Sequence, residues 1–279
     1  MSRIEVLIAA MNQTDDSLYD KLRLQTDAVI ANQTDSCWYK EYERDGSLVK
    51  IVSTAGRGVG RNRNIALLNA SADICILGDQ DLLYAEGYPR MVDEAFGQLP
   101  DADVIVFHIV NLKNPSKRII TGVRRVGYFN FARYGTCRMA FRRESILKAN
   151  IWFSLLYGGG ARYSSGEDTL FLGEAYRKGL KIYTHPGKIA DAVQETSTWF
   201  NGYTEKFFID KGVLLANLFP RMKYAVGLKM AFRFRKESAF SFLTIIRLIF
   251  SGIKEFKKAG DMNRFSARRR FSANINSGA

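Results

Sequence analysis

The sequence predicts an α/β protein in which helices flank a mostly parallel sheet, followed by a helical C-terminal extension. Short apolar runs alternate with segments of helical spacing, and this alternation is typical of parallel sheets. The run Ile74–Leu77 has no polar interruption, as expected of a strand covered by helices on both faces. With 47% hydrophobic and 13% aromatic residues among 279, the chain can bury a sizeable core.

The first elements follow from apolar runs and the turns between them. Ile4–Ala10 predicts the first strand, and Leu18–Leu24 is expected to form a helix after a polar turn. Ala28–Ala31 and Lys50–Ser53 predict two further short strands. Arg61–Ala70 has apolar residues at helical spacing and is predicted to be the next helix.

The alternation continues after the apolar run. Tyr88–Phe96 and Thr169–Lys178 are predicted helices, whereas Asp103–Val110, Arg138–Phe141 and Lys181–Thr184 are predicted strands. We therefore expect one large α/β domain over residues 1–219 and a separate helical tail over residues 220–279.

An acidic pair follows the apolar run directly, in the segment Asp79-Gln80-Asp81. In an extended backbone Asp79 and Asp81 point to one side and Gln80 to the other. Ligands of open α/β sheets bind beyond the carboxyl ends of the strands, and paired carboxylates suit Mg²⁺ or Mn²⁺ on a diphosphate. The alternative is an ordinary polar turn, in which Asp is common.

A glycine-rich turn, Gly56–Gly60, precedes the predicted helix Arg61–Ala70. Such turns can hold phosphates through free backbone amides, although this one matches neither the dinucleotide fingerprint nor the P-loop. Arg57, Arg61 and Arg63 lie in or beside the turn, and guanidinium groups suit phosphate oxygens. A flexible turn with a solvated basic face is the alternative.

A second acidic pair, Glu167 and Asp168, follows Gly166 at the start of the helix Thr169–Lys178. Acids in a first turn favour the helix dipole, which is the simplest role for this pair. The other role is proton transfer, because a helix N-terminus helps to keep a carboxylate ionised.

The cysteines and the N-terminus bear on the cellular location. Cys37, Cys75 and Cys137 are far apart and odd in number, which indicates reduced thiols in a cytosolic compartment. Residues 1–10 lack the pattern of a signal peptide, and no uncharged apolar run is long enough to span a bilayer. We expect a cytoplasmic protein, at the inner face of the cell membrane if its tail binds lipid.

The tail carries most of the positive charge. Residues 221–270 contain 14 Lys and Arg against three acids, so +11 of the net charge of +13 lies there. Phe240–Lys258 has a broad apolar face and predicts an amphipathic helix, in which Arg247 disfavours spanning a membrane. The basic flanks Arg233–Lys236 and Arg268–Arg270 favour an anionic membrane surface. Packing of this helix on the preceding domain is the alternative.

Four segments, in this order, resemble motifs of the inverting family 2 glycosyltransferases of the GT-A fold, which include enzymes of bacterial polysaccharide synthesis. The segments are the first strand ending at Asn12, Gly58–Asn64 before a helix, Asp79–Asp81, and Gly166–Asp168 before a second helix. The resemblance implies inverting transfer of a sugar from a nucleotide-diphosphate sugar to a saccharide or lipid-linked saccharide acceptor.

The resemblance also implies roles for single residues. Asp79 and Asp81 would hold Mg²⁺ or Mn²⁺ on the donor diphosphate, and Asp168 would be the general base. His185 would be a further metal ligand, or else a structural histidine before Pro186. The residues implied in donor binding are Asn12, Asn32, Asp35, Arg61, Arg63, Asn64 and Asp79. Glu167 and Trp199 would lie near the acceptor.

Two segments depart from the family pattern. The family has Pro before a first-strand Tyr-Asn and an Asp pair after the second strand. This sequence has Ala10-Met11-Asn12 and Asn32-Gln33-Thr34-Asp35 at these places. The acid that reads the nucleotide base is therefore replaced by Asn32 or supplied by Asp35, which leaves the base of the donor open.

Two other classes of function share some of these features. A sugar-1-phosphate nucleotidyltransferase would also use a nucleotide-binding sheet and a metal, but it would release pyrophosphate. A non-catalytic nucleic-acid-binding protein would fit the basic tail and the alternation of Phe and Arg in Ala231–Lys236. Because the charge lies beside an aliphatic helix and not a polar groove, we expect no nucleic acid partner.

Overall fold

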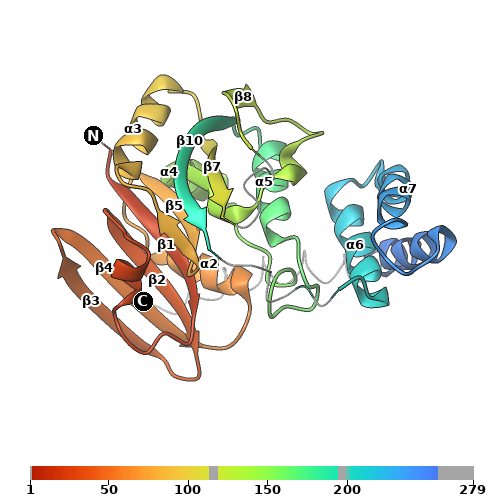
Figure 1. Ribbon diagram of the computed structural model, residues 1–279, viewed down its shortest axis with the longest axis horizontal. Coiled ribbons are helices and arrows are strands. Elements are labelled where there is room, and N and C mark those ends of the chain that lie inside the picture. Colours follow the sequence, from red (N-terminus) through yellow and green to blue (C-terminus); the bar gives the residue numbers. More distant parts are fainter. Residues whose placement is uncertain (1, 113–118, 194–199, 201, 257–279) are drawn as a thin grey trace, which may run out of the picture. The chain divides into compact units, whose positions relative to one another are not determined.

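The computed structural model describes residues 2–112, 119–193, 200 and 202–256 (Figure 1). The chain divides into two compact units, Met1–Trp199 and Phe200–Ala279. The second unit starts earlier than the predicted tail, because it includes the helix α6 (Glu205–Leu218). Each unit has its own hydrophobic core.

Ten strands form one sheet in the described part of the first unit, which confirms the predicted fold class. The spatial order is β3-β4-β2-β1-β5-β9-β7-β10-β6, and β8 pairs with β10. The bounds are β1 Ile4–Met11, β2 Asp27–Thr34, β3 Trp38–Arg44, β4 Ser47–Ala55, β5 Ile74–Asp79, β6 Leu82–Tyr84, β7 Val104–Asn111, β8 Arg124–Arg125, β9 Met139–Arg142 and β10 Ile182–Ala192.

The strand directions bring the polar strand ends to one edge of the sheet. Strands β4, β2, β1 and β5 are parallel neighbours. Strand β9 is antiparallel to both β5 and β7, so β7 and its parallel partner β10 run in the same direction as β5. Ala9 pairs with Asp79, and Asn32 lies between Ala10 and Ser53. Ligands of α/β sheets bind at this carboxyl edge.

Helices cover both faces of the sheet. Residues of α1 (Leu18–Lys21) and α3 (Tyr88–Gln98) share one core cluster with Ile8, Ile30 and Ile76 of the central strands. Helix α2 (Val59–Asn69) packs on β1 and β2, and Phe171 of α5 (Glu167–Arg177) packs against Phe141 of β9. The short helix α4 (Arg143–Lys148) follows β9 directly. Alternate residues of the buried strands therefore contact helices on opposite faces, as the uninterrupted apolar run predicts.

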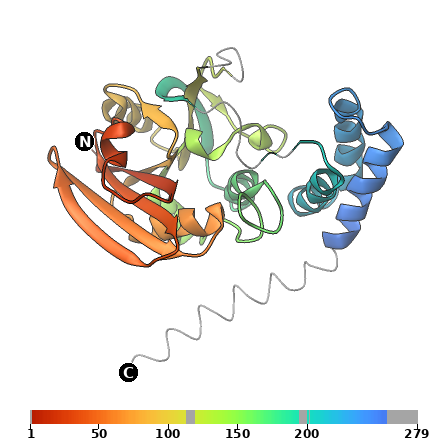
Figure 2. The ribbon, with the colours of Figure 1, turned by 60° about the horizontal axis from the view of Figure 1, so that its bottom comes forward.

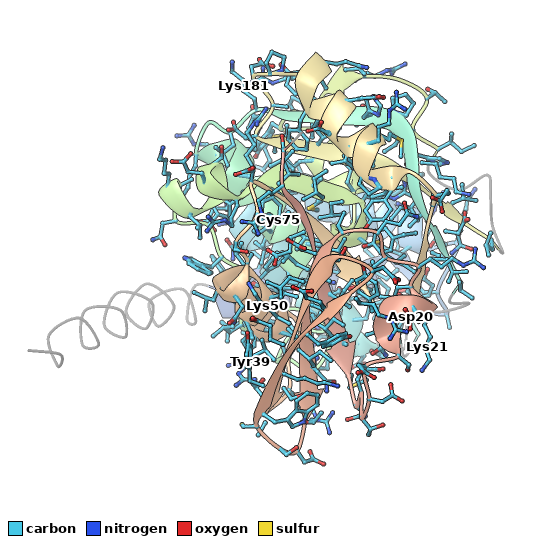
Figure 3. All side chains as sticks on the ribbon, turned by 90° about the vertical axis from the view of Figure 1, so that its left-hand side faces the viewer. Asp20, Lys21, Tyr39, Lys50, Cys75 and Lys181 are labelled. Atoms are coloured by element: carbon cyan, nitrogen blue, oxygen red, sulfur yellow. The ribbon has the colours of Figure 1, made fainter. Side chains whose placement is uncertain are left out.

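The differences from the predicted elements have local causes. Helix α1 has a single turn because Arg23, with φ of 57°, takes the left-handed conformation directly after it. Strand β3 was not predicted, because its residues are mostly exposed and charged at the edge of the sheet, where Tyr39 lies at the surface (Figure 3). Cys75 lies inside the sheet in the same view, and all three cysteines are free thiols.

The described part of the second unit is a bundle of three helices, α6, α7 (Lys223–Phe234) and residues 242–256 (Figure 2). The third helix confirms the amphipathic helix predicted over Phe240–Lys258. Its apolar residues Ile245, Ile249 and Ile253 are buried in a core shared with α6 and α7. A Cβ at Gly212 would lie 2.1 Å from the Ile249 carbonyl oxygen, so two helix backbones touch there.

The apolar face of the third helix is thus covered within its own unit by α6 and α7, and α6 lies in the range predicted for the preceding domain. The basic segment Arg268–Arg270 lies outside the described residues. Across the described chain, no helix is both long and apolar enough to cross a bilayer.

Candidate active site

Arg63 of α2 joins two acidic residues that are far apart in the sequence. Its Nη2 donates to Asp79 Oδ1 at 2.9 Å, and its Nη1 donates to Glu167 Oε1 at 2.8 Å. The Arg63 side chain is 6% exposed, that of Glu167 12% and that of Asp79 35%. The Arg63 guanidinium also lies 5.6 Å from the centre of the Phe153 ring. One buried cation therefore holds the end of β5 and the start of α5 together.

The acidic turn after β5 is tied to the end of β1 by Gln80. The Gln80 Oε1 atom accepts hydrogen bonds from Met11 N at 2.8 Å and from Gln13 Nε2 at 3.1 Å. Burial raises the pKa of Asp81 above its ordinary value, and the negative charge of Asp79 adds to the shift. Asp79 and Asp81 are thus close enough to repel each other, which a cation placed between them would relieve.

The two carboxylates fit a Mg²⁺ or Mn²⁺ ion. Mg²⁺ is usually held by one or two carboxylates together with phosphate oxygens of a substrate. Asp79 Oδ1 is bonded to Arg63, while about a third of the Asp79 side chain is exposed. Asp81 is partly exposed as well. These two carboxylates are suited to a metal whose other ligands include oxygens of a bound diphosphate.

His185 is not brought together with this acidic pair. It lies in β10 where the pairing with β7 is irregular, between Thr184 and Lys188. Its Nδ1 atom accepts a hydrogen bond from Gly187 N at 3.1 Å, and its ring packs 5.5 Å from the Phe107 ring. Burial lowers its pKa. Among the described residues no three His, Cys, Asp or Glu side chains converge as a metal site.

Asp168 stands in the first turn of α5, which starts at Glu167 after Gly166. Its Oδ1 atom accepts hydrogen bonds from Thr169 N at 2.6 Å and Thr169 Oγ1 at 3.2 Å. A Cβ on Gly135 would lie 3.7 Å from Asp168 Oδ2, so a glycine faces this second oxygen. Burial raises the pKa of Asp168 to about 6, and the charge of Glu167 adds to the shift. Such a carboxylate can accept a proton near neutral pH.

The loop that contains Gly158 and Gly159 packs between the starts of α2 and α5. Val59 N donates to Gly159 O at 2.9 Å. Gly158 has φ of 103°, and a Cβ there would lie 2.6 Å from Val59 Cγ1 and 2.8 Å from Glu167 Oε2. Only glycine fits this place, because any side chain would push the Glu167 carboxylate away from Arg63.

Asn32 and Asp35, the two candidates for reading the nucleotide base, differ in exposure. Asn32 is completely buried. Its side-chain oxygen accepts from Gln13 N, and its side-chain nitrogen donates to Gln13 O and, at 2.8 Å, to Ser53 Oγ. The Asp35 side chain is 97% exposed, 3.5 Å from Arg57 Nη2. Asp35 is therefore the accessible acid, and Asn32 supports the loop after β1. Asn12 is exposed in that loop, with a left-handed φ of 55°.

Two of the predicted donor-binding residues on α2 are used within the protein. The Asn64 amide donates to Phe153 O at 2.9 Å and accepts from Phe153 N at 2.8 Å. Arg61 Nη1 donates to Thr54 Oγ1 at 2.8 Å. Asn64 thus positions the loop that carries Phe153 through one donor and one acceptor of its side-chain amide. Arg61 is partly exposed beside the glycine-rich turn and keeps donor groups toward it.

Some residues that shape the site were not predicted. Buried Gln33 accepts a hydrogen bond from Gly58 N at 2.8 Å, which sets the glycine-rich turn at the end of β2. Buried Asn62 donates to Ala10 O at 2.9 Å and to Ala31 O, which joins β1 and β2 to α2. Gln33 lies near the end of β2 and Gln80 directly follows β5, so the signal for both is a side-chain amide at the end of an apolar strand. Trp199, expected near the acceptor, lies outside the described residues.

Comparisons with known proteins support the fold. No family model matches the chain, and no curated protein matches it. Among solved structures it is similar to Staphylococcus aureus TarS residues 1–349 in complex with UDP-GlcNAc, at 16% identity, over 85% of this chain and 73% of that chain, with a TM-score of 0.59. TarS 1–349 in complex with UDP is similar at 14% identity, over 84% and 72%, with a TM-score of 0.57. The chain therefore has a fold like that of glycosyltransferase structures.

Proposed function

We propose that this protein is a glycosyltransferase. It transfers a sugar from a nucleotide-diphosphate sugar to a hydroxyl group of a saccharide or lipid-linked saccharide, with inversion at the anomeric carbon. The observation that carries this proposal is the Arg63 bridge between Asp79 and Glu167, which draws together the acidic turn of β5 and the Asp168 end of α5. The UDP-GlcNAc and UDP complexes of TarS, which has a similar fold, support a nucleotide-sugar donor.

On the donor side, Asp79 and Asp81 would hold a divalent cation when the donor is bound. When bound, that cation supplies charge neutralisation for the leaving nucleoside diphosphate. Arg63 fixes one oxygen of Asp79, and Gln80 anchors the turn, so the carboxylates do not have to be ordered when the donor arrives. We assign contacts with the nucleotide to Asp35, which is exposed, and to Arg61, which is partly exposed.

On the acceptor side, Asp168 takes the proton from the attacking hydroxyl group. Its raised pKa leaves it ionised above about pH 6 and still basic enough to accept a proton. Because attack and departure occur on opposite sides of the sugar in a single displacement, the configuration at the anomeric carbon inverts. An α-linked donor therefore gives a β-linked product.

Glu167 has a positioning role in this scheme. Its Oε1 accepts from Arg63 and its Oε2 accepts from Gly166 N at 3.1 Å, so each oxygen already accepts one hydrogen bond. Its charge also adds to the raised pKa of Asp168, its neighbour in the first turn of α5. The predicted contact of Glu167 with the acceptor would use a remaining lone pair of these oxygens.

A panel of nucleotide-diphosphate sugars, each incubated with the purified chain and Mg²⁺ or Mn²⁺, tests the proposal. We expect release of a nucleoside diphosphate from at least one of them, and loss of most of this release in Asp81→Asn. Glu174→Gln is the matched control, because Glu174 pairs with Lys178 at the other end of α5. Formation of pyrophosphate from a nucleoside triphosphate and a sugar phosphate, without diphosphate release, would contradict the proposal.

A further inference from the structure

Three large apolar residues of helix α7 are exposed on the second unit, whereas its other large apolar residues pack against the core of that unit. Tyr224, Leu228 and Phe232 are spaced four residues apart and are 41%, 44% and 56% exposed. We call these three residues the α7 stripe. The row beside the stripe on the same helix holds Gly227 and Ala231, which are buried in the bundle. These small residues permit close packing of the helices, and the stripe beside them remains exposed.

The segment that contains the stripe is strongly basic. Between residues 221 and 236 the sequence has no Asp or Glu. Its six basic residues are Arg221, Lys223, Lys229, Arg233, Arg235 and Lys236. The Arg235 guanidinium lies 3.9 Å from the centre of the Phe232 ring, and Lys223 Nζ lies 5.6 Å from that of Tyr224. The charged groups therefore border the aromatic rings of the stripe.

We propose that the α7 stripe and its basic border form a docking surface for an anionic lipid bilayer. Aromatic and aliphatic side chains enter the boundary between headgroups and acyl chains, while Lys and Arg reach the anionic headgroups. The residues of this surface belong to the second unit and those of the candidate active site to the first, and the proposal does not depend on the function proposed for that site. It also differs from the surface predicted from the sequence, since the apolar face of residues 242–256 is buried.

Other occupants fit this surface less well. A symmetric contact between two copies would place the same basic segment against itself, with no acid in it to balance the charge. A nucleic acid would need a polar track for its phosphates, but the middle of this face is apolar. On the third helix, Leu243 is the large apolar residue that is strongly exposed, at 75%, and it does not continue the stripe.

Flotation of the full chain with vesicles tests this surface. The two vesicle types are phosphatidylcholine alone and phosphatidylcholine mixed with phosphatidylglycerol. We expect binding to the mixed vesicles that weakens as salt is added. Leu228→Ser with Phe232→Ser should weaken binding at least about tenfold, whereas Leu243→Ser should change it less than about twofold. All variants retain residues 257–279, so any difference between them arises from α7.

A charge series completes the test. Arg235→Ser with Lys236→Ser should lower the binding constant about fivefold for each charge removed. Arg247→Ser with Lys254→Ser removes two exposed charges from the third helix and is the matched control. Circular dichroism and thermal unfolding check that each variant is folded. The altered side chains are exposed, so we expect unchanged melting temperatures.

Four results would overturn the proposal. The first is equal vesicle binding by the α7 and control variants. The second is a wild-type dimer that the α7 variants dissociate in sedimentation velocity. The third is tight binding to generic duplex DNA that the same variants abolish while the vesicles remain unbound. The fourth is absence of vesicle binding together with a lowered melting temperature of the α7 variants, which would show that the face is covered within the protein.

Discussion

The Asn64 amide and the Phe153 peptide group form a reciprocal pair of hydrogen bonds, with Phe153 N donating at 2.8 Å and Phe153 O accepting at 2.9 Å. The pair fixes the Phe153 ring, which stacks 4.3 Å from Phe171 and lies beneath the Arg63 guanidinium. The Asn64 amide on α2 therefore fixes the aromatic ring against which the Arg63 guanidinium of the candidate site lies.

Asn64→Asp tests this positioning role. The carboxylate can still accept from Phe153 N, but it cannot donate to Phe153 O and will repel it. We expect the free energy of unfolding to fall by about 1 to 3 kcal/mol in urea titrations. If Asn64 instead binds the nucleotide, the stability should be unchanged and the KM for the donor should rise.

Arg63→Lys tests the bridge between Asp79 and Glu167. Lysine keeps the charge but lacks the fork that reaches both carboxylates, so one of them loses its partner. We expect kcat to fall at least about tenfold while the protein stays folded. Arg90→Lys is the control, because Arg90 forms an exposed pair with Glu94 on α3. Full activity of Arg63→Lys would show that a point charge is sufficient.

Removal of divalent cations should abolish sugar transfer. We expect chelation to lower the rate about 10²- to 10³-fold or more, because the leaving diphosphate then lacks its counter-charge. Addition of Mg²⁺ or Mn²⁺ in excess over the chelator should restore the rate. Thermal unfolding with and without chelator separates this effect from a loss of fold. A full rate in excess chelator would rule out the metal role of Asp79 and Asp81.

The pH dependence should report on Asp168. Its pKa is raised to about 6, by burial first and then by Glu167, so the base form accumulates as the pH rises through that value. We expect kcat/KM to increase from pH 5 to a plateau above about pH 7. Asp168→Asn should lower transfer about 10²- to 10⁴-fold and remove this limb of the profile. Glu174→Gln should keep both the rate and the profile.

The raised pKa of Asp168 also affects the free energy of unfolding. Folded Asp168 holds its proton to a higher pH than the unfolded chain does, so unfolding releases protons between the two pKa values. The contribution of Asp168 is thus fully present below about pH 4 and is lost as the pH rises through about 6. Asp168→Asn should therefore be more stable than the wild type at pH 7 and lose this advantage at low pH. The opposite order in urea titrations would mean that the carboxylate is stabilised in its charged form.

The local features of the site could be predicted, because each depends on a few neighbouring residues. The apolar run that ends at Asp79, and the glycine before Glu167, indicate a strand end and a helix start without tertiary information. The pairing of Arg63 with both acids could not be predicted in this way. It requires the tertiary fold, in which α2 packs on β1 and β2 and its Arg63 reaches the end of β5 and the start of α5. An arginine beside a glycine-rich turn suits a phosphate equally well.

The helices of the tail also show what residue spacing alone cannot predict. Helical spacing identifies the apolar face of Ile245, Ile249 and Ile253, but spacing does not say what covers that face. The glycines at 212 and 252, which allow the helix crossing, lie far apart in the sequence and have no local signature. The exposed stripe of α7 became visible only after the buried side of each helix was known.

Gln80 links the acidic turn after β5 to the end of β1. Its side-chain oxygen is bonded to the Met11 peptide, so a movement of the end of β1 pulls on the residue between Asp79 and Asp81. If the proposed donor displaced the loop after Met11, it would change the spacing of the two carboxylates, and with it their affinity for a cation. Such linkage is reciprocal, so a cation that tightens the turn strengthens the hold on the donor by the same factor.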